Sequence, residues 1–316
     1  KEQTIRIEAT LQDHVEPALL PPEQLDAYQK MFNSSFEERD QVLRALAETG
    51  QEAVGSMGDD TPLAVLSQQQ RSLFDYFRQQ FAQVTNPPID PLRESIVMSL
   101  ETCLGVELNI FEDSPRHARR IILSSPVLSP RKFEQLKTFE HEDFKREIIS
   151  LLYDPGAMGL QQAVEAIADR AEQAARSGRA LLILSDAGLV PGLLPAHSLL
   201  ATGAVHHRLI ARGLRCDANI IVETGAARDS HQIAALLGFG ATAVYPYLSF
   251  NIISNLLQTG ELLGDEISVH SNYRRGINKG LMKILSKRGI STTASYRGVQ
   301  LFEAVGLATR SIRTWC

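Results

Sequence analysis

Cysteine is scarce in this sequence, which holds only Cys103, Cys216 and Cys316 among its 316 residues. The three cysteines are odd in number, lie far apart and form no Cys-x-x-Cys pair. A disulfide framework, a zinc ribbon and an iron–sulfur cluster held by these residues alone are therefore not expected. Sparse, unpaired cysteines are typical of a reducing compartment, so the sequence predicts a cytoplasmic protein without a metal site of its own.

The sequence also lacks a strong excess of charge and a long apolar run. Its 32 lysines and arginines and its 37 aspartates and glutamates give a net charge of -5. A mildly acidic chain is a poor match for the phosphate backbone of a nucleic acid. The longest apolar stretches, such as Ala180–Leu184 and Asn219–Val222, are far shorter than a membrane span, which needs about 20 residues. Residues 1–20 contain no apolar core of a signal peptide, so neither nucleic acid nor membrane is an expected partner.

The first half of the chain predicts an irregular, mainly helical region. Glu23–Thr49 has helical composition, and Gly50 is a typical helix stop. Short strands are expected near residues 3–8 and 121–123, where apolar residues alternate or cluster briefly.

A second helix is expected between Ser67 and Asn86. Its apolar residues recur at helical spacing and predict one buried stripe, made of Leu73, Phe74, Phe77, Phe81 and Val84. Ser67 is a candidate N-cap for this helix. Pro87 and Pro88 cannot continue a helix, so we expect it to end near Asn86.

The second half alternates between short apolar runs and helical segments. The apolar runs are Ala180–Leu184, Asn219–Glu223 and Thr242–Tyr245. The helical segments are Leu160–Arg176, Pro195–Arg212, Arg228–Leu237 and Phe250–Leu263. Continuous apolar runs are typical of strands buried on both faces, and their alternation with helices predicts β–α units around a parallel sheet. We therefore expect an α/β protein with a helical first half, followed by an incomplete or modified (β/α) barrel, or alternatively by an open doubly wound sheet.

Polar residues follow each of these apolar runs, at what would be the carboxyl ends of parallel strands. They are Ser185, Asp186, Glu223, Thr224 and Tyr245. Ligand sites of parallel α/β folds gather at this edge, which makes a shared binding cluster one interpretation. Asp, Ser and Thr also cap helices and bridge loops, and that interpretation stays open.

Two further patterns concern basic residues and histidine. The densest positive segment is Tyr273–Arg288, whose apolar residues recur at helical spacing. It is either a solvated cationic helix or a helix that docks on an acidic partner or approaches a phosphate. His206 and His207 lie next to each other in a predicted helix, where adjacent side chains project about 100° apart, so they are not expected to share a metal ion.

Five longer strings carry a family resemblance. They are GSMGDDTPLAVLS at Gly55–Ser67, LFDYFRQQFAQVTNPPIDPLRE at Leu73–Glu94, GAVHHRL at Gly203–Leu209, IIVETG at Ile220–Gly225, and SNYRRGINKGLMKILSKRGISTTASY at Ser271–Tyr296. Together they closely resemble the large subunit of bacterial glutamate synthase. The resemblance runs from about Leu20 to Leu307 and does not extend to the tail Ala308–Cys316. Within it, Ala226, Asp229, Arg288 and Val299 depart from the residues that the family usually has.

The resemblance implies a place within a larger enzyme. Members of that family carry an amidotransferase that releases ammonia from glutamine, a central domain, an FMN-binding (β/α) barrel that forms glutamate with 2-oxoglutarate, and a β-helix. By this resemblance, residues 1–20 are a linker from the amidotransferase and residues 21–270 are the central domain. Residues 271–316 would be the truncated start of the FMN-binding synthase domain.

The same resemblance places cofactors and catalytic groups outside this chain. The nucleophilic cysteine of the family is absent, and the ligands of its 3Fe–4S cluster and most of its FMN site lie beyond residue 316. We therefore expect no catalytic residue and no cofactor here, and no activity from this chain alone. The full enzyme would hold FMN and a 3Fe–4S cluster, and would receive electrons from an NADPH-oxidising small subunit or from ferredoxin.

One string has a specific role in the family. The Thr-Asn pair of VTNPPID lies where ammonia passes from the amidotransferase to the flavin site, which implies that Thr85 and Asn86 line an ammonia channel. Uncharged hydrogen-bonding groups suit neutral ammonia. Asn86 also fits a helix C-cap ahead of a proline stop. The alternatives to a connecting domain are an independent flavin- or phosphate-binding (β/α) enzyme and a module that senses a small molecule.

Overall fold

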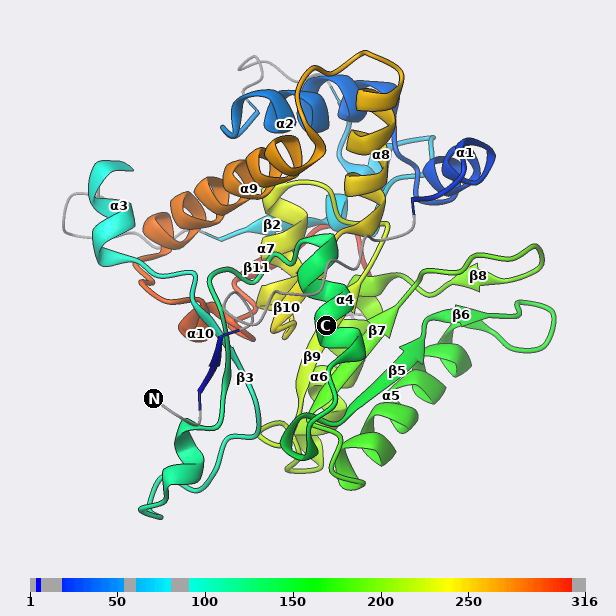
Figure 1. The fold of residues 1–316 in the computed structure, drawn as a ribbon. Coiled ribbons are helices and arrows are strands. Elements are labelled where there is room, and N and C mark those ends of the chain that lie inside the picture. Colours follow the sequence, from blue (N-terminus) through cyan, green and yellow to red (C-terminus); the bar gives the residue numbers. More distant parts are fainter. Residues whose placement is uncertain (1–3, 7–18, 54–60, 81–90, 309–316) are drawn as a thin grey trace.

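A parallel sheet lies at the centre of the computed structural model, which describes residues 4–6, 19–53, 61–80 and 91–308 (Figure 1). It has four strands in the order β10-β9-β7-β5. The strands are β5 (Arg146–Ser150), β7 (Leu181–Ser185), β9 (Asn219–Glu223) and β10 (Ala243–Tyr245). The order of the strands across this sheet follows their order in the chain, with only the short strands β6 and β8 of a separate pair between them, and each neighbouring pair is parallel. A (β/α) barrel adds each new strand next to the previous one. In a doubly wound sheet the strand order reverses at one point, so that later strands are added at the other edge. The expected α/β class with an incomplete barrel arrangement is confirmed.

Helices connect these strands. They are α5 (Leu160–Arg176), α6 (Ser198–Ala211) and α7 (Ser230–Gly238), and α8 (Tyr247–Gln258) follows the last strand. Each helix overlaps a predicted helical segment, although α8 begins before the predicted Phe250 and ends before the predicted Leu263, and β9 has the predicted bounds. Helix α5 packs on β5, β7 and α6, and α6 packs on β7, β9 and α7. Because helices and loops cover both faces, all residues of β7 and β9 are buried, which explains their continuous apolar runs.

The helical first half packs around two long helices of the second half. Helix α1 (Pro22–Met31) contacts α8, and α2 (Ala45–Thr49) lies along α9 (Glu266–Arg288) (Figure 1). A π-helical turn at Glu38–Arg44 leads into α2. Gly50 ends α2 in the left-handed conformation with φ 61°, as the sequence predicts. The expected boundary between residues 270 and 271 lies within α9.

The remaining elements are short. A three-stranded sheet has the order β1-β4-β3, made of β1 (Ile5–Arg6), β4 (Ile121–Leu123) and β3 (Thr102–Leu104). Two small pairs join β2 (Phe77–Gln79) with β11 (Phe302–Ala304) and β6 (Leu152–Tyr153) with β8 (Leu194–Pro195). The short helices are α3 (Pro91–Val97), α4 (Pro130–Thr138) and α10 (Thr293–Tyr296). Turns of 3-10 helix occur at Ala64–Leu66, Leu73–Tyr76, Pro115–Ala118 and Glu142–Phe144.

The helix predicted between Ser67 and Asn86 is wrong over the described residues 67–80. A 3-10 turn at Leu73–Tyr76 leads directly into strand β2, which pairs antiparallel with β11 more than 200 residues away. Phe74 and Phe77 are buried as predicted, and Phe77 meets Phe239 edge to face at 5.1 Å between ring centroids. Their spacing fits a turn followed by a strand as well as a helix, and pairing with β11 decides between the two. Phe81, Val84 and residues 85–90 lie outside the described residues.

Candidate functional site

The predicted polar residues at the strand ends do lie side by side. The parallel register aligns Ser185 with Glu223 and Glu223 with Tyr245, so one row of side chains crosses three strands. The Ser185 hydroxyl donates to Glu223 Oε2 at 2.5 Å. Tyr245 stacks on Phe133 of α4 with ring centroids 4.4 Å apart. The row therefore joins neighbouring strands at their carboxyl ends.

Asp186, the residue after Ser185, is the centre of a second set of contacts. Its Oδ1 accepts from the Gly225 amide at 2.9 Å, and its Oδ2 lies 2.5 Å from Thr224 Oγ1. Thr224 Oγ1 also lies 3.0 Å from the Ser198 hydroxyl and accepts from the Ala226 amide at 3.0 Å. Asp186 thus connects the end of β7 to the turn after β9 and, through Thr224, to the first residue of α6.

The strand-end residues are closed off from solvent. Asp186 is 1% exposed, and Ser185, Glu223 and Tyr245 are 6–7% exposed. Burial raises the pKa of Asp186 to about 7 and raises the pKa of Glu223 as well. Since the polar groups bond to one another and the Tyr245 ring is covered by Phe133, we find no space at the described strand ends for a flavin ring. The described residues do not fit FMN at this edge.

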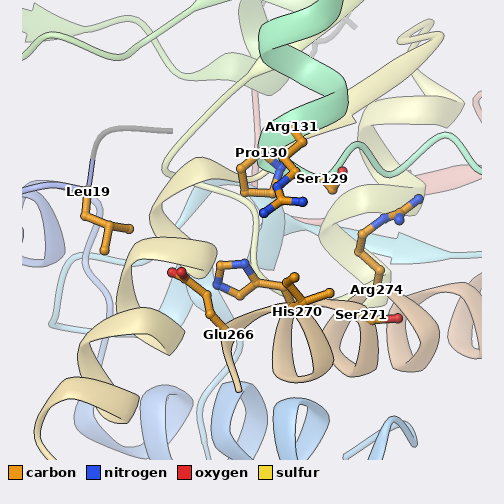
Figure 2. A pocket seen from close by; sticks show the side chains of 9 residues that line it. Leu19, Ser129, Pro130, Arg131, Glu266, His270, Ser271 and Arg274 are labelled. Carbon is orange, nitrogen blue, oxygen red and sulfur yellow. The ribbon is translucent and has the colours of Figure 1, made fainter. Parts of the chain in front are cut away.

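An open cleft lies instead between the N-terminus of α4 and the first turns of α9 (Figure 2). Its volume is about 310 Å³. The described residues that line it are Leu19, Ser129, Pro130, Arg131, Glu266, Ile267, His270, Ser271 and Arg274. Two arginines therefore face one cleft from two different helices, with apolar side chains between them. The sequence gives no sign of this arrangement, because the two helices are more than 130 residues apart.

A hydrogen-bonded chain runs along one side of this cleft. Ser254 donates its hydroxyl proton to Glu266 Oε1 at 2.6 Å, and His270 Nε2 lies 3.0 Å from the same hydroxyl oxygen. A serine has only one hydroxyl proton, so His270 must donate its Nε2 proton to Ser254. Burial lowers the pKa of His270. The charge of Glu266 and a hydrogen bond to the Phe250 backbone act in the opposite direction on this pKa.

The basic segment predicted at Tyr273–Arg288 is helical, as expected, and forms most of α9. Its charged side chains form hydrogen bonds and ion pairs with other parts of the fold. Arg274 Nε donates to the Val127 carbonyl at 3.0 Å, and Lys283 pairs with Glu52 at 3.1 Å. Arg288, a departure from the family string, is only 5% exposed and lies over the rings of Tyr296 and Phe302. The interpretation as a fully solvated cationic helix is therefore wrong for Arg288.

His206 and His207 point to different partners, as their adjacent positions predict. His206 Nδ1 accepts from Arg215 Nε at 3.0 Å, whereas His207 Nε2 lies 2.8 Å from Gln300 Nε2. Among the described residues, no group of three histidine, cysteine, aspartate or glutamate side chains is placed to hold a metal ion. These residues therefore do not fit an iron–sulfur cluster.

Thr85 and Asn86, the predicted channel residues, lie outside the described residues. Within the described ranges, no helix is both long enough and apolar enough to cross a membrane.

Comparison with known proteins gives one consistent result. Residues 27–308 match the sequence profile described as glutamate synthase central domain. The chain is 44% identical over 280 residues to the glutamate synthase [NADPH] large chain of Bacillus subtilis, covering 89% of this chain and 18% of that protein. It is 42% identical to the chloroplastic ferredoxin-dependent glutamate synthase of Oryza sativa subsp. japonica, covering 89% and 18%. It is 39% identical to the glutamate synthase [NADH] of Schizosaccharomyces pombe, covering 87% and 13%.

The matched region is a domain that glutamate synthases of bacteria, fungi and plants share. The chain belongs to the glutamate synthase central domain family. It spans less than a fifth of the length of these relatives. Among solved structures, a flavocytochrome b2 aligns with a TM-score of 0.37 at 16% identity, over 59% of this chain and 41% of that one.

Proposed function

We propose that this chain is the central domain of a glutamate synthase and connects a glutaminase domain to an FMN-binding synthase domain of the same polypeptide. The single observation that supports this most is the family match across residues 27–308. The relatives' printed names also support it, because all three are glutamate synthases several times longer than this chain. In this proposal the domain contributes to forming glutamate from glutamine and 2-oxoglutarate without supplying the reacting groups.

The proposed organisation follows the family resemblance. Residues 1–20 would lead from the amidotransferase, residues 21–270 would form the central domain, and residues 271–316 would begin the synthase domain. FMN and a 3Fe–4S cluster would be held by other parts of the polypeptide. An NADPH-oxidising small subunit or ferredoxin would supply electrons. The relatives' names include both kinds of donor at nearly equal identity, so they do not select one.

Purified alone, the 316-residue chain is expected to be colourless and to lack both glutaminase and glutamate synthase activity. The reason is that the described strand ends are filled by side chains, and the described residues hold no cluster that could bind iron. The measurements are a visible absorption spectrum, in which a bound flavin would appear, and an assay of glutamine hydrolysis. A stoichiometric yellow chromophore would instead favour the independent flavin enzyme.

In the complete enzyme, Thr85→Val is expected to uncouple the two reactions. Valine has nearly the shape of threonine but lacks the hydroxyl, so a polar contact for ammonia is lost while the volume is kept. The ratio of glutamine consumed to glutamate formed should rise, by up to about fivefold if one hydrogen bond of about 1 kcal/mol is lost. Both products are measured in one assay, since a loss of stability would lower them together.

Two comparisons make this test specific. Thr85→Ser keeps the hydroxyl and should keep the wild-type ratio. Glutamate formation from added ammonia should be less affected by Thr85→Val, because that ammonia need not come from the glutaminase. A Thr85→Val enzyme with the wild-type ratio would remove the channel role from this residue and leave the family assignment intact.

A further inference from the structure

The central sheet ends at an open edge. Strand β5 is its outermost strand and pairs only with β7 among the described strands (Figure 1). The Lys145 carbonyl accepts from the Leu181 amide at 3.1 Å, and the Leu151 amide donates to the Ser185 carbonyl at 2.8 Å. Alternate residues of a parallel strand bond to the same neighbour, so the odd-numbered residues of β5 face β7. The residues whose backbone N–H and C=O groups point to the open edge are Arg146, Ile148 and Ser150.

Nothing in the described part of the chain bonds to these outward backbone groups. Free N–H and C=O groups along an edge strand are a template for a further strand. Both charged side chains of β5 are engaged within the fold, because Arg146 donates to the Phe139 carbonyl at 2.9 Å and Glu147 accepts from Arg170 Nε at 2.9 Å. The side chain at the centre of β5 is Ile148, which is 46% exposed. The edge is therefore apolar at its middle and open to pairing.

A groove follows this edge, and we call it the β5 groove. Two hollows of about 720 and 660 Å³ form it, and Ile148 lines both. The first continues past the carboxyl end of β5, and the second continues past its amino end. One stripe of helix α5 lines the first hollow and consists of Ala163, Ala166, Ile167, Arg170 and Gln173. Because alanine is small, its two positions on this stripe leave space beside the edge of β5. The five residues of the strand offer about 17 Å to a partner.

The two ends of the β5 groove differ in polarity. The lining near the amino end of β5 is mainly charged and includes Glu140, Glu142, Lys145, Arg146, Glu147 and Arg179. The lining beyond the carboxyl end carries an apolar group, made of Leu152, Tyr153, Met158 and Leu193. A segment that lies along the whole groove therefore needs polar residues at one end and apolar residues at the other.

We propose that the β5 groove binds an extended segment from another domain of the same polypeptide, which adds one strand to the sheet. This proposal rests on the proposed function. The chain covers only 18%, 18% and 13% of three glutamate synthases, so most of such a polypeptide lies outside it and can supply the strand. Main-chain hydrogen bonds to the outward groups of Ile148 and its neighbours hold the segment, and its apolar residues pack on Ala166 and Tyr153. The open edge of the sheet is closed in this way.

A second copy of this chain fits the β5 groove less well. Two copies related by a twofold axis pair the same strand with itself in antiparallel direction. The amino end of one β5 then lies beside the carboxyl end of the other. This contact presses the charged group around Glu140 and Lys145 against Leu152 and Tyr153, which removes water from charges without giving them a new partner. A segment of different sequence can match both ends.

Hydrogen–deuterium exchange, resolved by residue, compares the isolated chain with the complete enzyme. In the isolated chain the Ile148 amide is expected to exchange at nearly the rate of an unstructured peptide, because it has no hydrogen-bond partner in the described fold. In the complete enzyme its exchange should be at least about tenfold slower, because it donates to the added strand. The Ile149 amide faces β7 and should be protected in both proteins, which controls for a difference in overall stability.

Ile148→Pro tests the strand pairing itself. Proline has no amide proton, and an outward position on an edge strand tolerates it, so the isolated chain should keep its fold. In the complete enzyme this variant should raise exchange of the Ser150 amide to the rate in the isolated chain, because the added strand can no longer pair. Ile148→Val keeps the amide and is the matched control, which should leave the Ser150 amide as protected as in the parent enzyme. Protection of the Ile149 amide shows in each case that β5 is folded.

Four results would overturn the proposal. The first is equal exchange of the Ile148 amide in the isolated chain and in the complete enzyme. The second is protection in the isolated chain that rises with protein concentration, which assigns the groove to a second copy. The third is protection in the isolated chain at every concentration, and the fourth is protection in the complete enzyme that Ile148→Pro leaves unchanged. A failure of the proposed function appears differently, as a parent polypeptide without glutaminase and synthase domains.

Discussion

Glu38→Gln is expected to lower the free energy of unfolding by about 3 kcal/mol, because it leaves the Arg228 guanidinium buried without its counter-charge. Arg228 is only 2% exposed. Its Nε and Nη2 donate to Glu38 Oε1 at 3.3 and 3.1 Å, and its Nη1 donates to the Phe32 carbonyl at 3.2 Å. Removing one partner from a buried pair typically costs about 3–5 kcal/mol, and the partly exposed Glu38 places this pair at the lower end.

The position of Arg228 explains why this pair matters for the fold. Through its side chain it ties the end of α1 and the turn at Glu38–Arg44 to the start of α7. Its carbonyl also accepts from the Tyr273 hydroxyl of α9 at 3.0 Å. Four segments therefore meet at one arginine, two from the helical first half and two from the barrel half.

A double-mutant cycle separates the pair from general damage. Arg228→Met alone should also be destabilising, because Glu38 loses its partner, but Arg228→Met combined with Glu38→Gln should cost less than the sum of the two. Arg39→Gln is the matched control. It breaks the neighbouring pair with Glu261, whose side chains are 21% and 38% exposed, and should cost about 0–1 kcal/mol. Equal losses from Glu38→Gln and Arg39→Gln in urea unfolding would contradict this role.

The sequence predicts the barrel half well because its strands are buried on both faces. Strands β7 and β9 have no exposed residue, so their apolar runs carry a strong and unambiguous signal. Strand β5 is different. It lies at the edge of the sheet, where Ile148 is 46% exposed and charged residues are tolerated. The segment Arg146–Ser150 therefore has no clear hydrophobic pattern. Strand β5 is therefore not predicted from the sequence.

In the first half of the chain, by contrast, contacts with residues far away in the sequence determine the local structure. Strand β2 exists because β11 supplies its hydrogen-bond partners, and nothing near Phe77 in the sequence contains that information. The cleft likewise depends on α4 and α9 coming together. For the strand-end cluster, the sequence predicts the position of the residues but not their burial. Parallel strands bring its members to one edge, as expected, but their burial depends on packing by Phe133 from another helix.

Asp186→Asn is expected to make the protein more stable than the parent chain above pH 7, and this gain should shrink as the pH falls toward 5. Burial holds the pKa of Asp186 at about 7, well above its value of about 3.9 in an unfolded chain. Between these two values the folded state binds a proton that the unfolded state does not. The contribution of this group to stability is therefore fully present below pH 4 and is lost as the pH rises to 7, by up to about 1.4 kcal/mol per pH unit.

The contacts around Asp186 fit the protonated form. A protonated Oδ2 can donate to Thr224 Oγ1, which then donates to Ser198 and still accepts from the Ala226 amide. Asparagine reproduces this pattern. Its Nδ2 can donate to Thr224, and its oxygen can accept from the Gly225 amide in place of Oδ1. The substitution thus keeps the contacts to Thr224 and Gly225 and removes the ionisation.

The measurement is the difference in unfolding free energy between Asp186→Asn and the parent chain at several pH values from 5 to 8. Taking the difference matters, because burial lowers the pKa of His197 to about 4 and that of His206 to about 3. Neutral buried histidines make stability rise with pH up to about 6.5, opposite to the effect of Asp186, and both chains share this term. Asp113→Asn, at an exposed position, should give a difference that is flat across the range. A flat difference for Asp186→Asn as well would mean that Asp186 ionises normally in the fold, and that its short contact to Thr224 is made by a carboxylate.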